Sequence, residues 1–298
     1  KALAIGFAET AERIVAIAGR ASPNPSAERA AWSARLADRQ HPKPREDAPL
    51  HLGDGCTKFL TQGNLFVHFD CAAGRIVARA GVTGQIAWSV PLPRLSPAVE
   101  RRNLSVKWRY RPIALLPVTN GASPALIAVA NIEQHEIVAG LATGRVTGFV
   151  VERIDVPPDS SGRTARRTWG RSMAGDYATG AAIGDSSIAV VGAITRLLSL
   201  ETGEVLARRA SGGWRYGWLF GDRGTAAPVT IPHPSGARFV VGGAAGRLLA
   251  IDERTHQVVW SIKLDEAILS VVADRFATAA ERDTARVFVT TRNRQMLA

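Results

Sequence analysis

Three short segments, residues 107–111, 167–171 and 214–218, alternate aromatic side chains with arginines. Aromatic rings beside guanidinium groups are typical of protein-interface hot spots, and they also suit an anionic backbone with unstacked bases. In the alternative interpretation, the rings fill gaps in a core while the arginines reach solvent. The residues that we predict to bind a partner protein or an anionic ligand are Trp108, Arg109, Tyr110, Arg111, Trp169, Arg171, Trp214, Arg215, Tyr216 and Trp218.

No catalytic constellation accompanies these segments. The sequence has no glycine-rich phosphate loop ending in Lys-Ser/Thr, no H-E-x-x-H zinc motif and no G-x-S-x-G nucleophile elbow. His135 lies between Glu133 and Glu136, an arrangement that could hold a metal ion, but a solvated turn is the favoured interpretation. The acidic segment Asp155–Gly162 likewise favours a surface loop over a cation loop. We therefore predict no catalytic residue, metal site or cofactor, and we expect that the protein is not an enzyme.

Charge and cysteine content suggest a compartment and a class of partner. Of the 298 residues, 46% are hydrophobic and 21% are charged, and no apolar run is long enough for a transmembrane helix. The net charge of +11 allows nucleic acid or a membrane surface as a partner, or reflects an arginine-rich composition. Cys56 and Cys71 are expected to be free thiols rather than a disulfide. We expect a cytoplasmic location, or a periplasmic one if an upstream signal peptide was removed. The oligomeric state stays open.

A repeated pattern of strands and turns predicts how the binding residues are positioned. The clearest copy, Arg238–Leu264, predicts strands at Phe239–Val241, Leu248–Ile251 and Val258–Ile262, separated by a glycine turn and a polar turn. Weaker copies place the second turn at Thr83-Gly84, Thr143-Gly144 and Thr202-Gly203. The third-strand anchors recur about every 57 residues, slightly longer than typical propeller repeats. These anchors are Trp32, Trp88, Phe149, Ala207 and Trp260.

Further apolar runs supply a fourth strand to several copies. They lie at Ile113–Val118, Ala226–Ile231 and Ala267–Val272. Residues 27–39 are interpreted as a strand, with a helix as the alternative. We place the repeats near residues 1–38, 56–93, 110–155, 175–210, 224–264 and 267–298, all within one domain that spans residues 1–298 of a larger protein.

The copy around Asp252, Thr255-His256 and Trp260 resembles the repeat of quinoprotein-like propellers, in which an acidic residue, a Thr-Gly turn and a Trp follow one another. WD-repeat proteins have a similar blade, but their Gly-His and Trp-Asp dipeptides are absent from this sequence. The resemblance implies an all-β fold, a β-propeller of about six four-stranded blades, with incomplete blades at both ends. It does not imply the quinone cofactor.

In such a ring, we expect the aromatic–arginine segments in the connections between blades, which share one face. The leading hypothesis is a non-enzymatic binding, sensor or scaffold propeller, a regulatory module of a larger bacterial multidomain protein. It would bind a partner protein or an anionic ligand on that face. The alternatives are a periplasmic scaffold resembling the outer-membrane assembly propeller, a nucleic-acid-binding propeller, and a fragment of a quinoprotein dehydrogenase.

Overall fold

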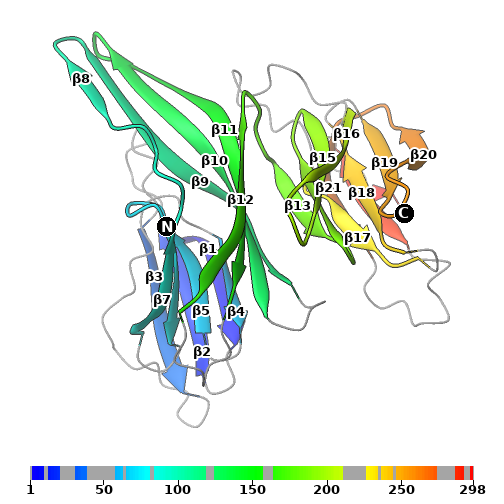
Figure 1. Cartoon of the computed structure of the whole chain (residues 1–298), viewed down its shortest axis with the longest axis horizontal. Coiled ribbons are helices and arrows are strands. Elements are labelled where there is room, and N and C mark those ends of the chain that lie inside the picture. Colours follow the sequence, from blue (N-terminus) through cyan, green and yellow to red (C-terminus); the bar gives the residue numbers. More distant parts are fainter. Residues whose placement is uncertain are drawn as a thin grey trace. The chain divides into compact units, whose positions relative to one another are not determined.

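Antiparallel strands make up the described part of the chain, which contains no helix (Figure 1). Among these residues there is consequently no helix that could cross a membrane. Two compact units divide the chain: unit 1 holds residues 1–144 and 152–168, and unit 2 holds residues 145–151 and 169–298. The computed structural model describes residues 2–9, 13–20, 31–38, 58–62, 65–80, 84–118, 124–156, 164–210, 226–233, 236–243, 246–273, 286–291 and 296–297.

Unit 1 begins with a three-stranded and a four-stranded sheet, in which strands adjacent in the sequence pair. The first sheet contains β1 (Ala2–Glu9), β2 (Arg13–Arg20) and β3 (Ala31–Asp38). Trp32 therefore lies on a strand and not on the alternative helix. The second sheet contains β4 (Phe59–Gln62), β5 (Leu65–Asp70), β6 (Arg75–Ala80) and β7 (Ile86–Pro91).

A five-stranded sheet departs from the predicted four-stranded pattern. Its strands are β8 (Val99–Arg101), β9 (Leu104–Val118), β10 (Ala125–Val138), β11 (Leu141–Asp155) and β12 (Arg166–Ala174). The predicted turn at Thr143-Gly144 is wrong, because β11 runs through both residues. The chain turns instead at Ala139 and Gly140, whose φ angles of 48° and 84° close a two-residue hairpin.

Unit 2 contains two four-stranded sheets and one three-stranded sheet among its described residues. The first contains β13 (Gly180–Ile183), β14 (Ser187–Val191), β15 (Ile194–Ser199) and β16 (Val205–Ala210). The second contains β17 (Val229–Ile231), β18 (Arg238–Gly242), β19 (Arg247–Asp252) and β20 (Val258–Lys263). The third contains β21 (Ile268–Ala273), β22 (Val287–Thr291) and β23 (Met296–Leu297). The strands predicted for residues 238–264 are confirmed, as are the added strands at β17 and β21.

The same hairpin turn recurs in the three four-stranded sheets. Gly84, Gly203 and His256 each donate their backbone N–H to the carbonyl four residues earlier, at 2.7, 2.9 and 2.9 Å. All three have positive φ angles, 69°, 70° and 59°. The strand register shifts by one residue just before each turn. Thr83 lies outside the described residues, but the predicted turns are structural copies at Gly84, Gly203 and His256, and His256 occupies the glycine position.

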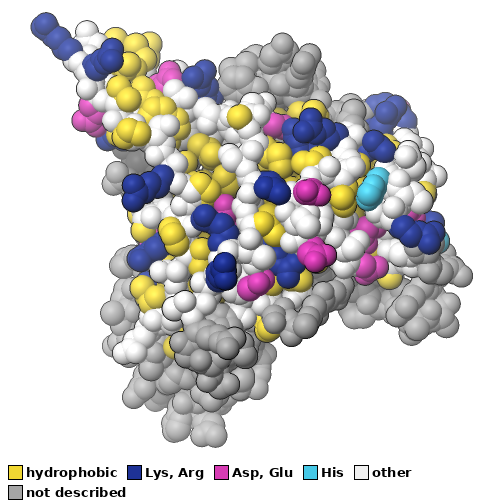
Figure 2. All heavy atoms as spheres, in the orientation of Figure 1, with side chains coloured by type: hydrophobic (Ala, Val, Ile, Leu, Met, Phe, Trp, Pro, Cys, Tyr) yellow, Lys and Arg dark blue, Asp and Glu magenta, His cyan; other side chains and the backbone are white. Residues whose placement is uncertain are grey.

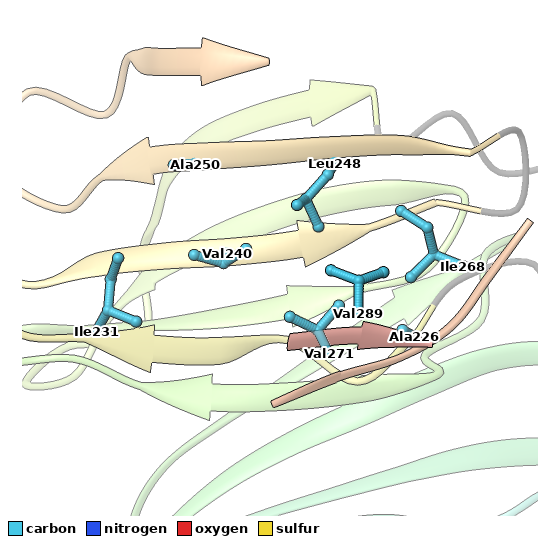
Figure 3. Close-up of a cluster of buried hydrophobic side chains, with 8 residues drawn as sticks. All are labelled: Ala226, Ile231, Val240, Leu248, Ala250, Ile268, Val271 and Val289. Atoms are coloured by element: carbon cyan, nitrogen blue, oxygen red, sulfur yellow. The ribbon is translucent and has the colours of Figure 1, made fainter. Parts of the chain in front are cut away.

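Small and branched side chains pack the sheets of unit 2 face to face. Figure 3 shows Leu248 of β19 beside Val271 and Val289 of β21 and β22. A second cluster joins β14 and β15 to β18 and β19 through Leu197, Phe239 and neighbours. Aliphatic residues of modest volume allow close sheet packing, and each sheet thereby buries a face that it could not bury alone. The full cluster of Figure 3 is Ala226, Ile231, Val240, Leu248, Ala250, Ile268, Val271 and Val289.

Glu253 fastens the two four-stranded sheets of unit 2 to each other. It follows β19, and only 4% of the residue is exposed. One carboxylate oxygen accepts hydrogen bonds from the backbone N–H groups of Ser186 and Ser187, at 2.7 and 2.6 Å, and from the Ser187 hydroxyl at 2.8 Å. The other accepts the Asp185 N–H at 2.8 Å. The tight turn before β14 therefore wraps around a buried carboxylate from the next sheet.

The structure can be compared with the predictions of free cysteine thiols and of a positive charge spread along the chain. Cys71, in the turn after β5, is disulfide-bonded, so the prediction of a free thiol is wrong for this residue. Cys56, the other cysteine of the chain, lies outside the described residues. Figure 2 shows Lys and Arg side chains spread between acidic ones over the visible face. The proposed repeat limits and the single-domain organisation stay predictions.

Candidate functional site

Residues 107–111 lie inside β9, not in a connection between blades as predicted. They pair with β10, so alternate side chains point to opposite faces. Tyr110 is 3% exposed, its hydroxyl donates to the Pro93 carbonyl, and its ring lies against Gly74. Burial raises the pKa of Tyr110 to about 12. Tyr110 therefore packs in the interior of unit 1, while Trp108 is half-buried.

The two arginines of this segment hold a buried carboxylate. Arg109 Nε and Arg111 Nη1 lie 3.0 and 3.3 Å from the carboxylate oxygens of Glu133, and His135 Nε2 lies 3.1 Å from one of them. Burial alone would raise the pKa of Glu133, but the bonds and charges from Arg109, His135 and Arg111 lower it below its ordinary value. His135 lies on β10 and not in the solvated turn that we expected. Within the described residues, no group of three potential metal ligands comes together.

Residues 167–171 also lie in a strand, β12, rather than in a connection. Trp169 is 8% exposed, and its Nε1 donates to the Leu200 carbonyl at 3.1 Å. Arg171 donates to the carbonyls of Gly203 and Thr202 at 3.0 and 3.1 Å. The two side chains thus cover the hairpin turn between β15 and β16.

Arg209 of β16 makes the equivalent contact with the next hairpin turn. Its Nη2 donates to the carbonyl of His256 at 2.6 Å and reaches Gln257 at 3.4 Å. Sequence reasoning missed this residue, although its position on the last strand of a repeat copy was a usable signal. Arg171 and Arg209 therefore form a repeated latch, in which an arginine binds the backbone of a turn in the following sheet. Some of the arginines that make the chain basic therefore form hydrogen bonds between neighbouring sheets.

The predicted binding residues are not brought together as one site. Trp214, Arg215, Tyr216 and Trp218 lie outside the described residues. The β9 and β12 segments each engage their own surroundings, and a joint role in binding stays a prediction.

A buried ion pair lies elsewhere in unit 1. Glu152 of β11 is 1% exposed and pairs with Arg167 of β12. Burial raises the pKa of Glu152 to about 7, and the positive charge of Arg167 offsets only part of this shift. Glu152 and Arg167 therefore form an ion pair in which the positive charge of Arg167 offsets only part of the cost of burying the carboxylate.

An exposed apolar sheet edge is the first surface feature that sequence reasoning missed. β20 is the last strand of its sheet, and no described strand pairs with its free edge. Val258, Val259 and Ile262 are 40%, 42% and 50% exposed, so aliphatic side chains reach solvent on both faces of the strand. Trp260 is half-buried against the cluster of Figure 3. An alternation of apolar residues would have signalled one buried face, and its absence in VVWSIK was the usable clue.

The second missed feature is the joined end of β8, β9, β10 and β11, residues 99–107 and 134–144, which we call the arm (upper left of Figure 1). Ile137, Val138 and Leu141 are 48%, 46% and 75% exposed. With Ala139 and Ala142 they form what we call the apolar tip. Beside it lies the β8–β9 turn, because the Ala139 N–H donates to the Asn103 carbonyl at 3.0 Å. Figure 2 shows apolar side chains in this region with basic and acidic side chains next to them.

Comparison with known proteins informs the fold. No family model matches the chain, and the search of curated proteins likewise gives no match. Among solved structures, Sqt1 of Chaetomium thermophilum, bound to the N-terminus of ribosomal protein L10, is 12% identical with a TM-score of 0.61, over 96% of this chain and 68% of that chain. BBS1N in complex with ARL6DN is 9% identical with a TM-score of 0.50, over 99% of this chain and 76% of that chain. Both are propellers of the WD-like class.

The fold is a β-propeller. A third structure, BamB from Moraxella catarrhalis, aligns over 98% of this chain and 94% of its own at 12% identity, but its TM-score of 0.39 is too low to carry an argument. At such identities the likeness extends to the fold alone. The predicted all-β propeller fold is confirmed, whereas the number of blades and the superfamily stay predictions.

Proposed function

We propose that this propeller is a non-enzymatic scaffold, which binds a partner protein by accepting an extended segment of that partner along β20. The observation that carries the proposal is the free edge of β20, with exposed aliphatic side chains on both faces. An unpaired strand edge offers a row of N–H and C=O groups to a further strand. Pockets between alternate side chains then give specificity.

Comparison with the other outer strands singles out β20. β7 alternates exposed and buried residues and ends at Pro91, which has no N–H for a further strand. β16 carries Arg208 and Arg209 within the strand, and charges of this kind discourage edge-to-edge pairing. β20 has its single charge at its last residue, Lys263. Of these three edges, β20 is the one that has neither a proline nor an internal charged residue to hinder pairing with a further strand.

The fold supports a binding role without specifying it. Both solved propellers with usable alignments were determined with a protein partner. In this chain, Arg109, Arg111, Arg171 and Arg209 bind groups of the protein itself, which favours a protein partner over nucleic acid. A scaffold or sensor role within a larger bacterial multidomain protein extends the same proposal.

The test compares two double variants in pull-down experiments with extract from the native cells. Val259→Lys with Ile262→Lys charges the β20 edge. Val205→Lys with Leu206→Lys charges β16 at residues of similar exposure, 37% and 40%, and is the matched control. We expect a partner that binds the wild type and the control but is lost from the β20 variant. The purified partner should then slow amide hydrogen exchange in β20; equal capture by all three proteins would refute the proposal.

The compartment is a further part of this proposal. A disulfide at Cys71 favours an oxidising environment, since cytosolic thiols are kept reduced. This supports the periplasmic alternative over the cytoplasmic expectation. Alkylation of the protein in unbroken cells tests it: the thiols should react only after a reductant is added, and immediate reaction would instead support a cytoplasmic location.

A further inference from the structure

The apolar tip of the arm has an unusual composition for a hairpin turn in water. Two-residue turns strongly prefer Asn, Asp and Gly, which tolerate positive φ angles and hydrate well. Here the turn is Ala139-Gly140, flanked by Ile137, Val138 and Leu141. Leu141 is 75% exposed, the largest exposed fraction among the exposed large hydrophobic residues described. Such a cluster marks a surface that is covered in its working state.

Basic side chains stand directly beside the apolar tip. Arg101 ends β8 and Arg102 begins the β8–β9 turn, which the Asn103 carbonyl connects to the tip through the Ala139 N–H at 3.0 Å. Both side chains are exposed, and neither pairs with a carboxylate among the described residues. By contrast, Lys107 is 3.3 Å from Glu100. The guanidinium groups of Arg101 and Arg102 therefore add positive charge beside the apolar tip, which Glu100 and Glu136 of the arm offset only in part.

We propose that the arm docks on an anionic lipid bilayer, with the apolar tip inserted among the acyl chains and Arg101 and Arg102 at the headgroup phosphates. Peripheral anchors bury aliphatic groups by about 5–10 Å and add attraction from basic residues. The tip extends about two to three residues along each strand, roughly 7–10 Å at the rise of a β-strand. The depth and the charge pattern both match the bilayer interface.

The shape of the tip favours a bilayer over a protein groove. Protein hot spots are enriched in Trp, Tyr and Arg that fill complementary pockets, and Leu and Val are under-represented. The apolar tip consists of aliphatic residues alone, on a narrow turn between two strands. A fluid bilayer accepts such a convex group without shape complementarity. This inference concerns unit 1 and is independent of the proposed binding at β20.

The test measures co-sedimentation of the whole chain with vesicles. We expect binding to vesicles of phosphatidylcholine mixed with phosphatidylglycerol, and weak binding to pure phosphatidylcholine. Val138→Asp with Leu141→Asp, and separately Arg101→Glu with Arg102→Glu, should each lower the partition coefficient at least about tenfold. Because a chain of charge +11 binds anionic vesicles unspecifically, each variant needs a control of equal charge change.

The controls lie in unit 2. Leu269→Asp with Val272→Asp alters two residues that are 57% and 55% exposed, and Arg247→Glu with Arg254→Glu alters two exposed arginines. Neither control should change binding by more than about twofold, since surface charge away from the membrane contact acts only through the screened field. If the controls and the arm variants lose binding equally, unspecific attraction explains the result and the proposal is wrong.

A second readout reports insertion itself. An environment-sensitive dye attached at Leu141→Cys should shift to the blue on anionic vesicles, whereas the dye at Leu269→Cys should not. An absent shift at position 141 overturns the proposal, as does a lack of vesicle binding by the wild type; the tip would then serve a protein partner. Loss of the β20 partner leaves this result unaffected, so the two proposals fail separately.

Discussion

The regular sheets of unit 2 and the arm of unit 1 use their side chains in opposite ways. In β13–β20, Glu253 and Arg209 bind backbone groups, Arg171 of β12 binds the turn between β15 and β16, and aliphatic residues fill the space between sheets. In the arm, Arg101 and Arg102 are free and Leu141 faces solvent. The strands differ accordingly: β14 and β15 have five and six residues, whereas β9 and β11 have 15 each. Residues within the repeat maintain the fold, and residues beyond it are available for contacts.

The largest effect in this comparison is expected at Glu253. Glu253→Ala removes the acceptor for three backbone N–H groups and for the Ser187 hydroxyl, and the donors of Ser187 are buried. We expect a loss of about 4 kcal/mol in the free energy of unfolding, because the buried Ser187 donors retain their desolvation penalty and the bonds to Asp185 and Ser186 are lost as well. Urea denaturation followed by tryptophan fluorescence measures it. Glu204→Ala, an exposed residue, should lose less than about 0.5 kcal/mol; similar losses would show that the turn does not depend on the carboxylate.

The parts of the fold that were predictable from sequence rest on local signals. Residues 238–264 show β-branched runs separated by Gly246 and by the Asp252–His256 turn, and each signal acts over a few residues. At Thr143-Gly144 the same local signal misleads. There β10 pairs with β9 over its whole length of 14 residues, and the chain turns at Ala139-Gly140, before the expected turn. Where a strand ends then depends on its pairing with the preceding strand, which a local signal does not contain.

Two glycines with positive φ angles allow the destabilisation caused by a steric clash to be distinguished from that caused by left-handed backbone strain. Gly203 has φ 70°, and a Cβ there would lie 2.5 Å from Cε3 of Trp169. Gly140 in the arm has φ 84°, with nothing within 4 Å. We expect Gly203→Ala to lower the free energy of unfolding by about 3 kcal/mol and Gly140→Ala by about 1 kcal/mol, because only the first adds a clash to the left-handed strain. Thermal denaturation of both variants measures the difference, and equal losses would contradict the latch around the turn.

The candidate site was less predictable than the fold. The composition of residues 107–111 and 167–171 correctly indicated side chains that make specific contacts. However, Tyr110, Trp169 and Arg171 make these contacts with groups of the protein itself. Whether such an arginine binds a partner or the backbone of a turn depends on which turn of the neighbouring sheet lies opposite it in the fold. The β20 edge and the arm carry no motif, and their exposure follows from strand order and length.

A smaller gain is expected where the repeat departs from glycine. His256 adopts φ 59° in the turn that Gly84 and Gly203 form elsewhere. His256→Gly should raise the free energy of unfolding by about 0.5 kcal/mol, since relief of left-handed strain slightly exceeds the added freedom of the unfolded chain. The Arg209 contact uses the backbone carbonyl and should persist. Chemical denaturation measures the gain, with Arg254→Gly at an exposed position two residues earlier as the control. A loss would show that the imidazole itself stabilises the turn.

The weakest effect concerns pH and the sheet that contains the arm. Because burial raises the pKa of Glu152 to about 7, the folded protein holds this proton more tightly than the unfolded chain does. Stability should therefore be highest below the ordinary glutamate pKa of 4.5, fall as the pH rises toward about 7, and change little from this group above it. Glu152→Gln should flatten that slope, measured as urea midpoints across the range, whereas Glu201→Gln at an exposed position should leave it unchanged. An unaltered slope in the Glu152 variant would mean that Arg167 compensates the buried carboxylate fully.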